Sequence, residues 1–558
     1  MVGRTAKTTS LACVKQKIGI VLKICIIGGG FTGLLTAIAV KKHCPQHQVV
    51  MLDSDREPQN LGFGESGPPD MLMQLIRALA VPEELQDRWL TDWLVGSNSV
   101  IKFNFKWQNF LDRNDPGYYS GLPSMPSYLS TLDPSHLGGF VNSDISVPQH
   151  DAYMLYDLWY ELYLQKRRSI ADFQPDINSF YYHCVEHSMP SYDNTMITNM
   201  GSVHINSFEA SAWLRKRYAK ILDEIVVGTV QSVKRNPQGA ITGLMLQQDQ
   251  ELTADFFIDC TGFKRVLAKQ LELPWRTPGT DIQHNSVLIV SNGYTENIDR
   301  EMHPYSVGYG MDHGWAFSIP LLNRKSTGYN YNSNDITADQ ALEEIATLSD
   351  PGTRLYDPIS LSWEPGVYQT NADKNFALVG LSATFVDPFD ANIIALQFRQ
   401  IFKLIDYFKN PQTRTLQELN DVTNAFADGV AERVELHQGL APRNTSEYWR
   451  RNHDIAKKKN LQDKVFDVMN DPIHSSRARA RGQLIPYLSH LYLSEIVYFG
   501  IDMSRRCRTS SPELLNLAEQ YFKHTNQLNQ MRAQLSTSMR DWYRAHRIDI
   551  DQYIKFRK

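Results

Sequence analysis

Apolar residues near the start of the chain form two continuous runs with a periodic stretch between them. Ile24–Ile27 and Val49–Leu52 are short uninterrupted runs, typical of parallel strands that are buried on both faces. Between residues 34 and 40 the apolar positions follow helical spacing. The pattern therefore predicts a strand–helix–strand unit over residues 22–55.

A strictly alternating stretch lies in the middle of the chain, at residues 313–320, "HGWAFSIP". In an extended strand, Trp315, Phe317 and Ile319 share one face. Pro320 has no N–H to donate and is expected to end the ladder. The pattern by itself fits a plain core strand as well as a strand that faces a reaction site.

Two later segments return to the buried-strand pattern, and the end of the chain is helical. "ADFFIDCTGF" (254–263) is a buried strand, and "FALVGLSATFVDPFDANIIALQF" (376–398) predicts a strand, a Pro turn and a helix. After Leu404 the pattern is mostly helical. Residues 510–546 predict one or two amphipathic helices, with Ser511 at the helix start.

The first strand leads directly into a glycine motif, "GGGFTG". Gly28 permits a tight turn, Gly30 lets the backbone approach a pyrophosphate, and Gly33 allows close helix–strand packing. Asp53 lies 20 residues after Gly33, where a carboxylate can take ribose hydroxyls. The residues expected to hold a dinucleotide here are Gly28, Gly30, Phe31, Thr32, Gly33 and Asp53.

The dinucleotide is expected to be FAD rather than NAD. A second glycine turn, "LGFGESGPP" (61–69), follows the second strand, and strands ending near Gly262 and Gly380 return to the nucleotide fold far along the chain. Large flavoproteins use such separated returns. The predicted fold class is α/β: a Rossmann-like FAD-binding domain of the glutathione-reductase type, discontinuous in sequence, with a mixed β-sheet substrate region and a C-terminal helical region.

The predicted domain boundaries follow these returns. We expect a flexible N-terminal tail, three pieces of FAD-binding domain, two substrate-side insertions and the helical region. In that order the ranges are 1–19; 20–100, 200–275 and 370–405; 101–199 and 276–369; and 406–558.

Composition narrows the class of protein. The 558 residues are 42% hydrophobic and carry a net charge of −4, which predicts no general attraction to nucleic acid or anionic lipid. No apolar run approaches the length of a membrane span. The six cysteines form no CxxC pair and the histidines show no ligand spacing, so we expect no metal and a reduced, cytoplasmic protein.

Five motifs in order, GGGFTGL, GFGESGPP, IDCTGF, WAFSIP and FVDPFDANI, resemble those of the tryptophan halogenase family, flavin-dependent halogenases within the FAD-dependent monooxygenase class. The resemblance extends from about Lys23 to about Arg450. It implies reduced FAD from a separate, transiently bound flavin reductase, O2, a flavin C4a-hydroperoxide and a halide ion. It also implies an electron-rich aromatic substrate of indole or phenol type, free or bound to a carrier or peptide, and a monomer or homodimer.

Site residues also follow from the resemblance. The additional cofactor-binding residues it implies are Gly64, Glu65, Ser66, Val230, Gly262, Gly380, Ala391, Asn392 and Ile393. The catalytic residues it implies are Asn98, Asp390, Trp315 and Phe317.

The chain departs from the family pattern at several of these positions, which marks it as an atypical member. Asn98 stands where the family has its essential lysine, or Ser99 does if the alignment shifts by one, whereas Lys102 matches a second basic position of the family. Asp390 replaces a glutamate and Phe317 a tryptophan. Ala-Asn-Ile at 391–393 replaces Ser-Thr-Gly.

Three functions therefore remain open. The first is a halogenase, with bromide or iodide preferred because their hypohalous acids react without help from a lysine. The second is a flavin-dependent hydroxylase or oxidase that has lost halogenation with the lysine. The third is a non-catalytic flavoprotein that binds a metabolite or partner. Aromatic residues that either stack on a planar substrate or simply pack are Tyr118, Tyr119, Tyr128 and Phe140.

Overall fold

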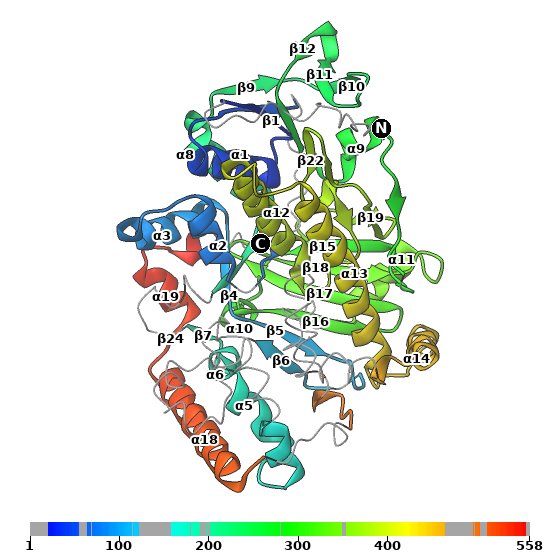
Figure 1. The fold of residues 1–558 in the computed structure, drawn as a ribbon. Helices are drawn as coiled ribbons and strands as arrows, with labels where there is room; N and C mark the ends of the chain where they lie inside the picture. Colours follow the sequence, from blue (N-terminus) through cyan, green and yellow to red (C-terminus); the bar gives the residue numbers. More distant parts are fainter. Residues whose placement is uncertain are drawn as a thin grey trace, which may run out of the picture.

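A computed structural model gives the fold of most of the chain (Figure 1). The predicted N-terminal tail, Tyr128 and Phe140 lie outside the described residues. The described residues are 21–54, 64–68, 70–113, 115–121, 158–178, 180–189, 197, 201–279, 281–348, 353–463, 495, 497–502 and 510–553.

A six-stranded sheet forms the nucleotide-binding half and confirms the predicted strand–helix–strand unit. Strand β1 (Lys23–Ile27), helix α1 (Phe31–His43) and strand β2 (Gln48–Asp53) follow one another, and β1 pairs in parallel with β2 and β13. The sheet order is β21-β22-β13-β1-β2-β9. The remaining strands of this sheet are β9 (Glu224–Val227), β13 (Phe256–Asp259), β21 (Ala372–Asp373) and β22 (Phe376–Leu378).

The continuous apolar run of β1 is explained by the layers on its two faces. Ile24 and Ile26 pack into a core with α1, whereas Cys25 and Ile27 pack into a second core under a three-stranded antiparallel sheet. That small sheet consists of β10 (Val230–Arg235), β11 (Ile241–Leu246) and β12 (Glu251–Leu252). A helix layer, a sheet that is parallel except for its edge strand β21, and a small antiparallel sheet make up the predicted FAD-binding Rossmann-like fold.

A seven-stranded mixed sheet builds the second half, in the order β19-β15-β18-β17-β16-β5-β6. Only β5 and β16 pair in parallel within it. Its strands come from both predicted insertions: β5 (Asn104–Gln108), β6 (Tyr118–Gly121), β15 (Ser286–Asn292), β16 (Tyr305–Met311), β17 (Gly314–Leu321), β18 (Arg324–Tyr331) and β19 (Ile359–Ser362).

Strand β17 is the alternating stretch of the sequence. Trp315 and Ile319 are buried and Phe317 is half-buried. Pro320 does not end the strand as predicted, because it pairs with Lys325 and the strand continues to Leu321. The pairing of β17 with β16 ends at Ser318, so β16 loses no hydrogen bond from the missing N–H of Pro320.

Long helices connect the two halves (Figure 1). Helix α12 (Asn392–Lys409) packs on α1, and α13 (Gln417–Leu440) packs on α12 and continues past the seven-stranded sheet. At the nucleotide end of α13, Asn420 Oδ1 accepts hydrogen bonds from the backbone N–H of Asn371 (2.6 Å) and Ala372 (2.8 Å). Near its other end, the His437 ring lies 5.0 Å from the ring of Trp107 on β5, so the same helix contacts both sheets.

The C-terminal region is helical among the described residues, as predicted. Helix α14 (Glu447–Lys459) packs on α13, and α18 (Pro512–Gln534) packs on α5 (Phe173–Ile177). Ser511 caps α18 by accepting a hydrogen bond from Leu514 N.

Among the described residues, the other α-helices and short strands are β3 (Glu65–Ser66), α2 (Met71–Ala78), α3 (Gln86–Gly96), β4 (Val100–Lys102), α6 (Tyr181–Val185), β7 (Ser188–Met189), β8 (Ser202–Ile205), α8 (Ser207–Tyr218), α9 (Val266–Gln270), β14 (Trp275–Arg276), α10 (Ile298–Glu301), α11 (Ala338–Ile345), β20 (Gly366–Tyr368), β23 (Thr384–Phe385), β24 (Thr537–Ser538), α19 (Met539–Ala545) and α20 (Ile550–Tyr553).

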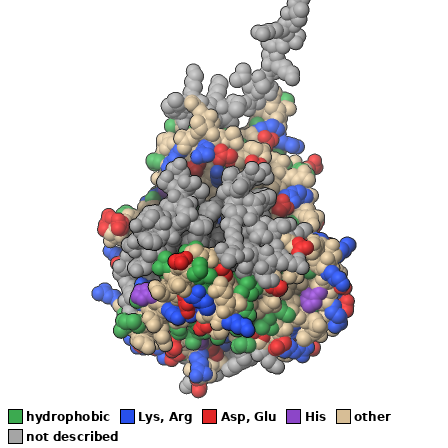
Figure 2. All heavy atoms as spheres, turned by 60° about the horizontal axis from the view of Figure 1, so that its bottom comes forward, with side chains coloured by type: hydrophobic (Ala, Val, Ile, Leu, Met, Phe, Trp, Pro, Cys, Tyr) green, Lys and Arg blue, Asp and Glu red, His purple; other side chains and the backbone are tan. Residues whose placement is uncertain are grey.

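The surface carries both signs of charge. Lys and Arg side chains are interspersed with Asp and Glu side chains over the face shown in Figure 2. Among the described residues, no helix combines the length and the apolar composition that crossing a bilayer requires. The thiols of Cys25, Cys44, Cys184 and Cys260 are buried and free.

A buried carboxylate joins the separated returns to the nucleotide fold. Asp259, at the end of β13, accepts hydrogen bonds from Thr261 N (2.8 Å), Thr261 Oγ1 (2.6 Å), Ser382 Oγ (3.1 Å) and Leu267 N (2.7 Å). These donors belong to the turn after β13, to α9 and to the segment after β22. The carboxylate therefore fixes the relative positions of segments that are far apart in sequence.

We expect Asp259→Asn to lower the free energy of unfolding by about 3 kcal/mol or more, because an amide nitrogen then faces donors and leaves them unpaired. Ser382→Ala removes a single donor and should cost about 1 kcal/mol. Urea unfolding of both variants measures the difference. Equal, small losses would show that Asp259 does not hold these segments together.

Candidate flavin and substrate site

The first glycine turn is shaped to receive an anionic group. Gly28 has φ +109°, and its N–H donates to Leu52 O at 2.8 Å. A Cβ on Gly33 would lie 1.8 Å from Gly28 O, so the helix packs directly on the turn. Gly30 begins α1 without a side-chain cap, and a Cβ there would meet nothing within 4 Å. This open helix N-terminus fits the pyrophosphate of FAD.

Asp53 and an arginine that the sequence did not single out lie beside this turn. The Asp53 carboxylate sits against Gly29, where a Cβ would be 2.2 Å from its carboxylate atoms. Arg215, near the end of α8, donates to Asp53 Oδ2 (2.5 Å) and to Gly29 O (3.1 Å). Only tertiary packing brings them together, and Arg215 orients the acid expected to bind the ribose.

The other predicted residues of the first turn are placed as part of α1. Phe31 is buried and its ring lies 6.5 Å from that of Trp93. Thr32 O accepts a hydrogen bond from Thr36 Oγ1 at 2.7 Å inside the helix. Two predicted cofactor residues lie outside this turn. Val230 begins β10, three residues after the end of the edge strand β9, and Gly262 has φ +62° three residues after the end of β13.

The second glycine turn packs against the alternating strand. Gly64 has φ +78°, and a Cβ there would lie 2.9 Å from the Ile319 side chain of β17. Glu65 is half-buried, and the loss of solvent around its carboxyl raises the pKa of that group. Ser66 Oγ accepts a hydrogen bond from Lys102 Nζ (2.5 Å) and contacts Ser306 Oγ (2.8 Å). The turn is therefore fixed to the seven-stranded sheet and, through Lys102, to β4.

Lys102 is buried, with 2% of its surface exposed. Its ammonium also donates to Gly67 O at 2.8 Å and lies 3.5 Å from the centroid of the Phe105 ring. Burial lowers its pKa well below the usual lysine value, and the charge of Asp390 opposes that shift. Lys102 therefore interacts electrostatically with Asp390, although it does not stand at the position of the family's essential lysine.

Asn98, which the sequence places at the family's lysine position, lies on the turn between α3 and β4. It has φ +54° and is buried. Its Nδ2 donates to Glu209 Oε1 of α8 at 3.3 Å, and its backbone oxygen accepts from Leu322 N. None of its described contacts is with Asp390, and its role stays a prediction.

Asp390 lies on a tight turn directly before α12. Asp390 and Ala391 both have positive φ, +58° and +55°, a conformation that L-residues adopt at a cost. Asn392 holds the turn, because its Nδ2 donates to Asp387 O (3.0 Å) and to Phe389 O. Ile393 continues α12 and is half-buried. The predicted helix start after Asp390 is therefore present without the glycine found in the family.

Gly380, in the segment after β22, packs against α12. It has φ +66°, and its N–H donates to Gln400 Oε1 of α12 at 2.7 Å. The side chain of Gln397 lies 3.0 Å from where a Cβ of Gly380 would be. The Gly380 segment and α12 are thus in close contact.

A buried network of hydrogen bonds around His284 holds the turn that carries Asp390. Asp387 Oδ2 bonds to His284 Nδ1 (2.9 Å), and His284 Nε2 bonds to Tyr448 Oη (2.6 Å). Tyr448 Oη also donates to Gln438 Oε1 at 3.0 Å. The other oxygen of Asp387 accepts from Phe389 N at 2.9 Å. This network thus connects α14 and α13 to the turn.

Aromatic rings pack around Phe389, the residue before Asp390. Phe389 stacks on Trp107 (4.7 Å between centroids) and meets Trp315 edge to face (5.0 Å). The Phe317 ring is 6.0 Å from that of Trp315 and packs over Gly328. Of the residues predicted to be catalytic, Trp315 and Phe317 therefore lie in the aromatic cluster that also holds Phe389, the neighbour of Asp390 in sequence.

The Asp390 carboxylate has unequal surroundings at its two oxygens. Oδ2 accepts from Arg433 Nε at 2.9 Å, whereas Oδ1 is buried and accepts no hydrogen bond from the described residues. Burial raises the pKa of Asp390, while Arg433 and Lys102 oppose the shift. Asp390 thus has one fixed oxygen and one available to accept a proton. The described residues form no group of His, Cys, Asp and Glu suited to a metal ion.

The glycine turn, the layered nucleotide domain and the separated returns define an FAD-binding flavoprotein of the glutathione-reductase type. The tryptophan halogenase family matches residues 23–492, and the chain belongs to that family. It is a flavin-dependent, oxidoreductase-type enzyme family, which agrees with the flavin site.

Named relatives are similar over most of their length. Tryptophan 7-halogenase RebH of Lentzea aerocolonigenes is 23% identical over 79% of this chain and 81% of its own. Tryptophan 6-halogenase ThaL of Streptomyces albogriseolus is 25% identical over the same shares. The crystal structure of the tryptophan 6-halogenase SttH from Streptomyces toxytricini has a TM-score of 0.75 at 20% identity, covering 94% of this chain and 99% of that one.

We expect Gly30→Ala and Gly33→Ala to act differently. Gly33→Ala forces a Cβ into Gly28 O and should destabilise the apoprotein by about 1–3 kcal/mol. Gly30→Ala meets no protein atom, so the apoprotein Tm should be unchanged while the Kd for FAD rises at least ~10-fold. Thermal unfolding and FAD titration measure both effects. Unchanged FAD affinity in Gly30→Ala would contradict the assignment of this turn to the pyrophosphate.

Proposed function

We propose that the chain halogenates an electron-rich aromatic substrate of indole or phenol type, using reduced FAD, O2 and a halide, with bromide or iodide preferred over chloride. The observation that carries this proposal is the Asp390 carboxylate. One of its oxygens accepts no hydrogen bond from the described residues, its neighbour Phe389 packs in an aromatic cluster, and the buried Lys102 opposes the rise of its pKa. A flavin reductase that binds transiently would supply the reduced cofactor.

The residues of the nucleotide half fit the cofactor. The open N-terminus of α1 would bind the pyrophosphate, Asp53 the ribose, and the turns at Gly64 and Ala391 the flavin end. Bound reduced FAD supplies the electrons that activate O2. Trp315 and Phe389 would keep the substrate and water apart from the flavin side.

On the substrate side, Asp390 acts as the proton acceptor. The hypohalous acid delivers its halogen to a ring carbon while the halogen–oxygen bond breaks. The ring C–H bond then breaks and its proton passes to Asp390 Oδ1, which later returns it to the released hydroxide as water. Burial raises the pKa of Asp390 and so strengthens it as a base.

Asn98 is the reason for the proposed halide preference. An amide donates a hydrogen bond to a hypohalous acid but does not form a haloamine. Bromide and iodide are more easily oxidised than chloride, and their hypohalous acids react without an amine. The same observation favours a second candidate function, hydroxylation or oxidation without halide.

We expect more halogenated product with bromide or iodide than with chloride when the protein is given reduced FAD, O2 and a panel of indoles and phenols. Asn98→Lys should raise the chloride-to-bromide product ratio, whereas Asn98→Ala should not, because only the first adds an amine. Mass spectrometry of the products measures the ratio. Hydroxylated product without halide would instead establish the second candidate.

We expect Asp390→Asn to lower kcat by about 10²–10⁴-fold, because an amide accepts no proton from the ring. Asp390→Glu keeps the carboxylate and should retain measurable turnover. Flavin affinity, measured by titration, should change little in either variant. Wild-type turnover by Asp390→Asn would show that another group accepts the proton.

A further inference from the structure

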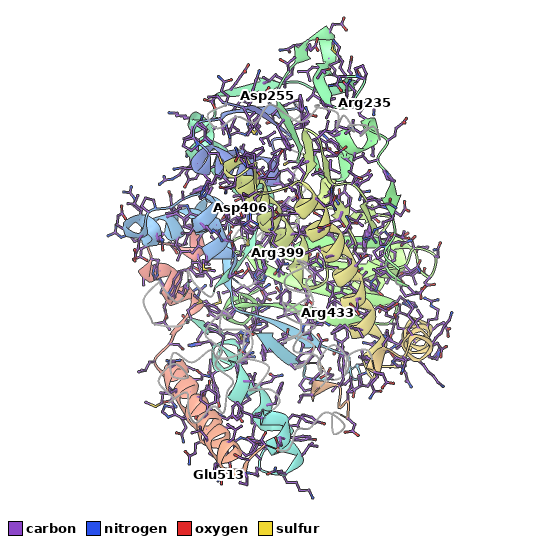
Figure 3. The ribbon with its side chains drawn as sticks, in the orientation of Figure 1. Arg235, Asp255, Arg399, Asp406, Arg433 and Glu513 are labelled. Atoms are coloured by element: carbon purple, nitrogen blue, oxygen red, sulfur yellow. The ribbon has the colours of Figure 1, made fainter. Side chains whose placement is uncertain are left out.

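The carboxylate of Asp390 is one end of a buried ionic chain centred on Arg433 of α13, labelled in Figure 3. The Arg433 side chain is 1% exposed, and the side chains of Asp390 and Glu495 are 3% and 5% exposed. Arg433 Nε donates to Asp390 Oδ2 at 2.9 Å. Its Nη1 donates to Glu495 Oε2 at 2.6 Å, and its Nη2 donates to Glu495 Oε1.

This arrangement fixes the guanidinium at both ends. The two Nη groups form a bidentate pair with Glu495, so the plane of the guanidinium cannot turn without breaking that pair. The Nε–H then points at Asp390 from a fixed position and occupies Oδ2. The other oxygen, Oδ1, remains without a described donor. Glu495 thus orients Arg433, and Arg433 orients Asp390.

The charge balance also depends on Arg433. A buried carboxylate among aromatic rings takes up a proton unless a cation compensates it. The titratable groups that interact with Asp390 come from several elements: Arg433 on α13, Lys102 on β4, Asp387 on the same turn, Tyr118 on β6, and Glu495. His437, one helical turn after Arg433, lies 3.6 Å from Glu495, and burial lowers its pKa well below the usual value.

Among these groups, only Arg433 and Lys102 are cations that favour the ionised form of Asp390. Lys102 is not hydrogen-bonded to Asp390 but to Ser66 and Gly67. Arg433 is therefore the cation in direct contact with the carboxylate, and its charge is shared with Glu495. Burial raises the pKa of Glu495 to about 7, so this sharing changes within the neutral range.

We propose that Arg433 is a positioning residue for the reaction, which keeps Asp390 ionised and turned so that Oδ1 faces the substrate, and that Glu495 sets how much of its charge Asp390 receives. This inference rests on the proposed function, because it assigns a task to the base of that reaction. The two residues that it adds, Arg433 and Glu495, lie in none of the sequence motifs.

The test is the pH dependence of kcat in four variants. Removal of the cation in Arg433→Gln should raise the pKa of Asp390 and move the acid limb upward by ~1 pH unit or more. Arg433→Lys keeps the charge and should restore the limb in part. Glu495→Gln removes the negative charge that shares Arg433 with Asp390, so the limb should move to lower pH. Arg276→Gln is the control. It removes an arginine of β14 that pairs with Asp428 on α13, the helix that carries Arg433, and should leave the pH profile unchanged.

A second measurement does not depend on turnover. Infrared difference titration of the full chain, with Asp390→Asn to assign the band, follows the protonated carboxyl of Asp390 directly. The protonation midpoint should rise in Arg433→Gln and not in Arg276→Gln. An unchanged midpoint in Arg433→Gln and Arg433→Lys, or an upward shift in Glu495→Gln, would overturn the inference.

The two proposals fail in different ways. If the wild type converts no aromatic substrate, the proposed function is wrong, and the infrared midpoints still decide whether Arg433 controls Asp390. If the wild type is active but Arg433→Gln keeps both its acid limb and its infrared midpoint, the inference is wrong and the function stands. If Arg433→Gln does not fold, Arg433→Lys and Glu495→Gln carry the comparison.

Discussion

The turn from residue 387 to 392 depends on the buried bond between His284 and Asp387. That carboxylate holds the N–H of Phe389 with its other oxygen, so the bond sets the direction in which the chain enters α12. The turn contains two residues in the left-handed region, a conformation that persists only where the surroundings enforce it. The backbone position of Phe389 and the start of α12 both depend on this constraint, and Arg433 then orients the Asp390 carboxylate.

The turn is also where the two halves of the molecule meet. The flavin half contributes α12 and the glycine turns, and the substrate half contributes Trp107 of β5 and Trp315 of β17, the strands on either side of β16 in the mixed sheet. The polar groups that hold the turn are hydrogen-bonded, whereas Asp390 Oδ1 accepts no hydrogen bond from the part of the chain that the structure describes. Buried polar groups are usually paired, and an unpaired one inside a rigid surround is typical of a group that acts on a ligand.

Local sequence patterns predicted the elements but not the ionic contacts. The apolar run of β1, the glycine turn and the alternation in β17 each depend on neighbours in sequence, and each formed as expected apart from the extra residue after Pro320. Arg433 lies in a helix whose pattern gives no sign that a charge is buried there. Its partners are 43 and 62 residues away, and Arg215 and His284 likewise meet their partners only through packing between distant segments.

Helix α13 has a consequence for how such an enzyme can diversify. Asn420 fastens one end to the nucleotide sheet, and Arg433 contacts Asp390, about 20 Å further along at 1.5 Å per residue. A rigid rod of fixed length and fixed rotation therefore connects cofactor and substrate regions. Side chains at its far end can be exchanged to suit new substrates, but a single inserted residue would turn every later side chain by 100° and disconnect the two regions.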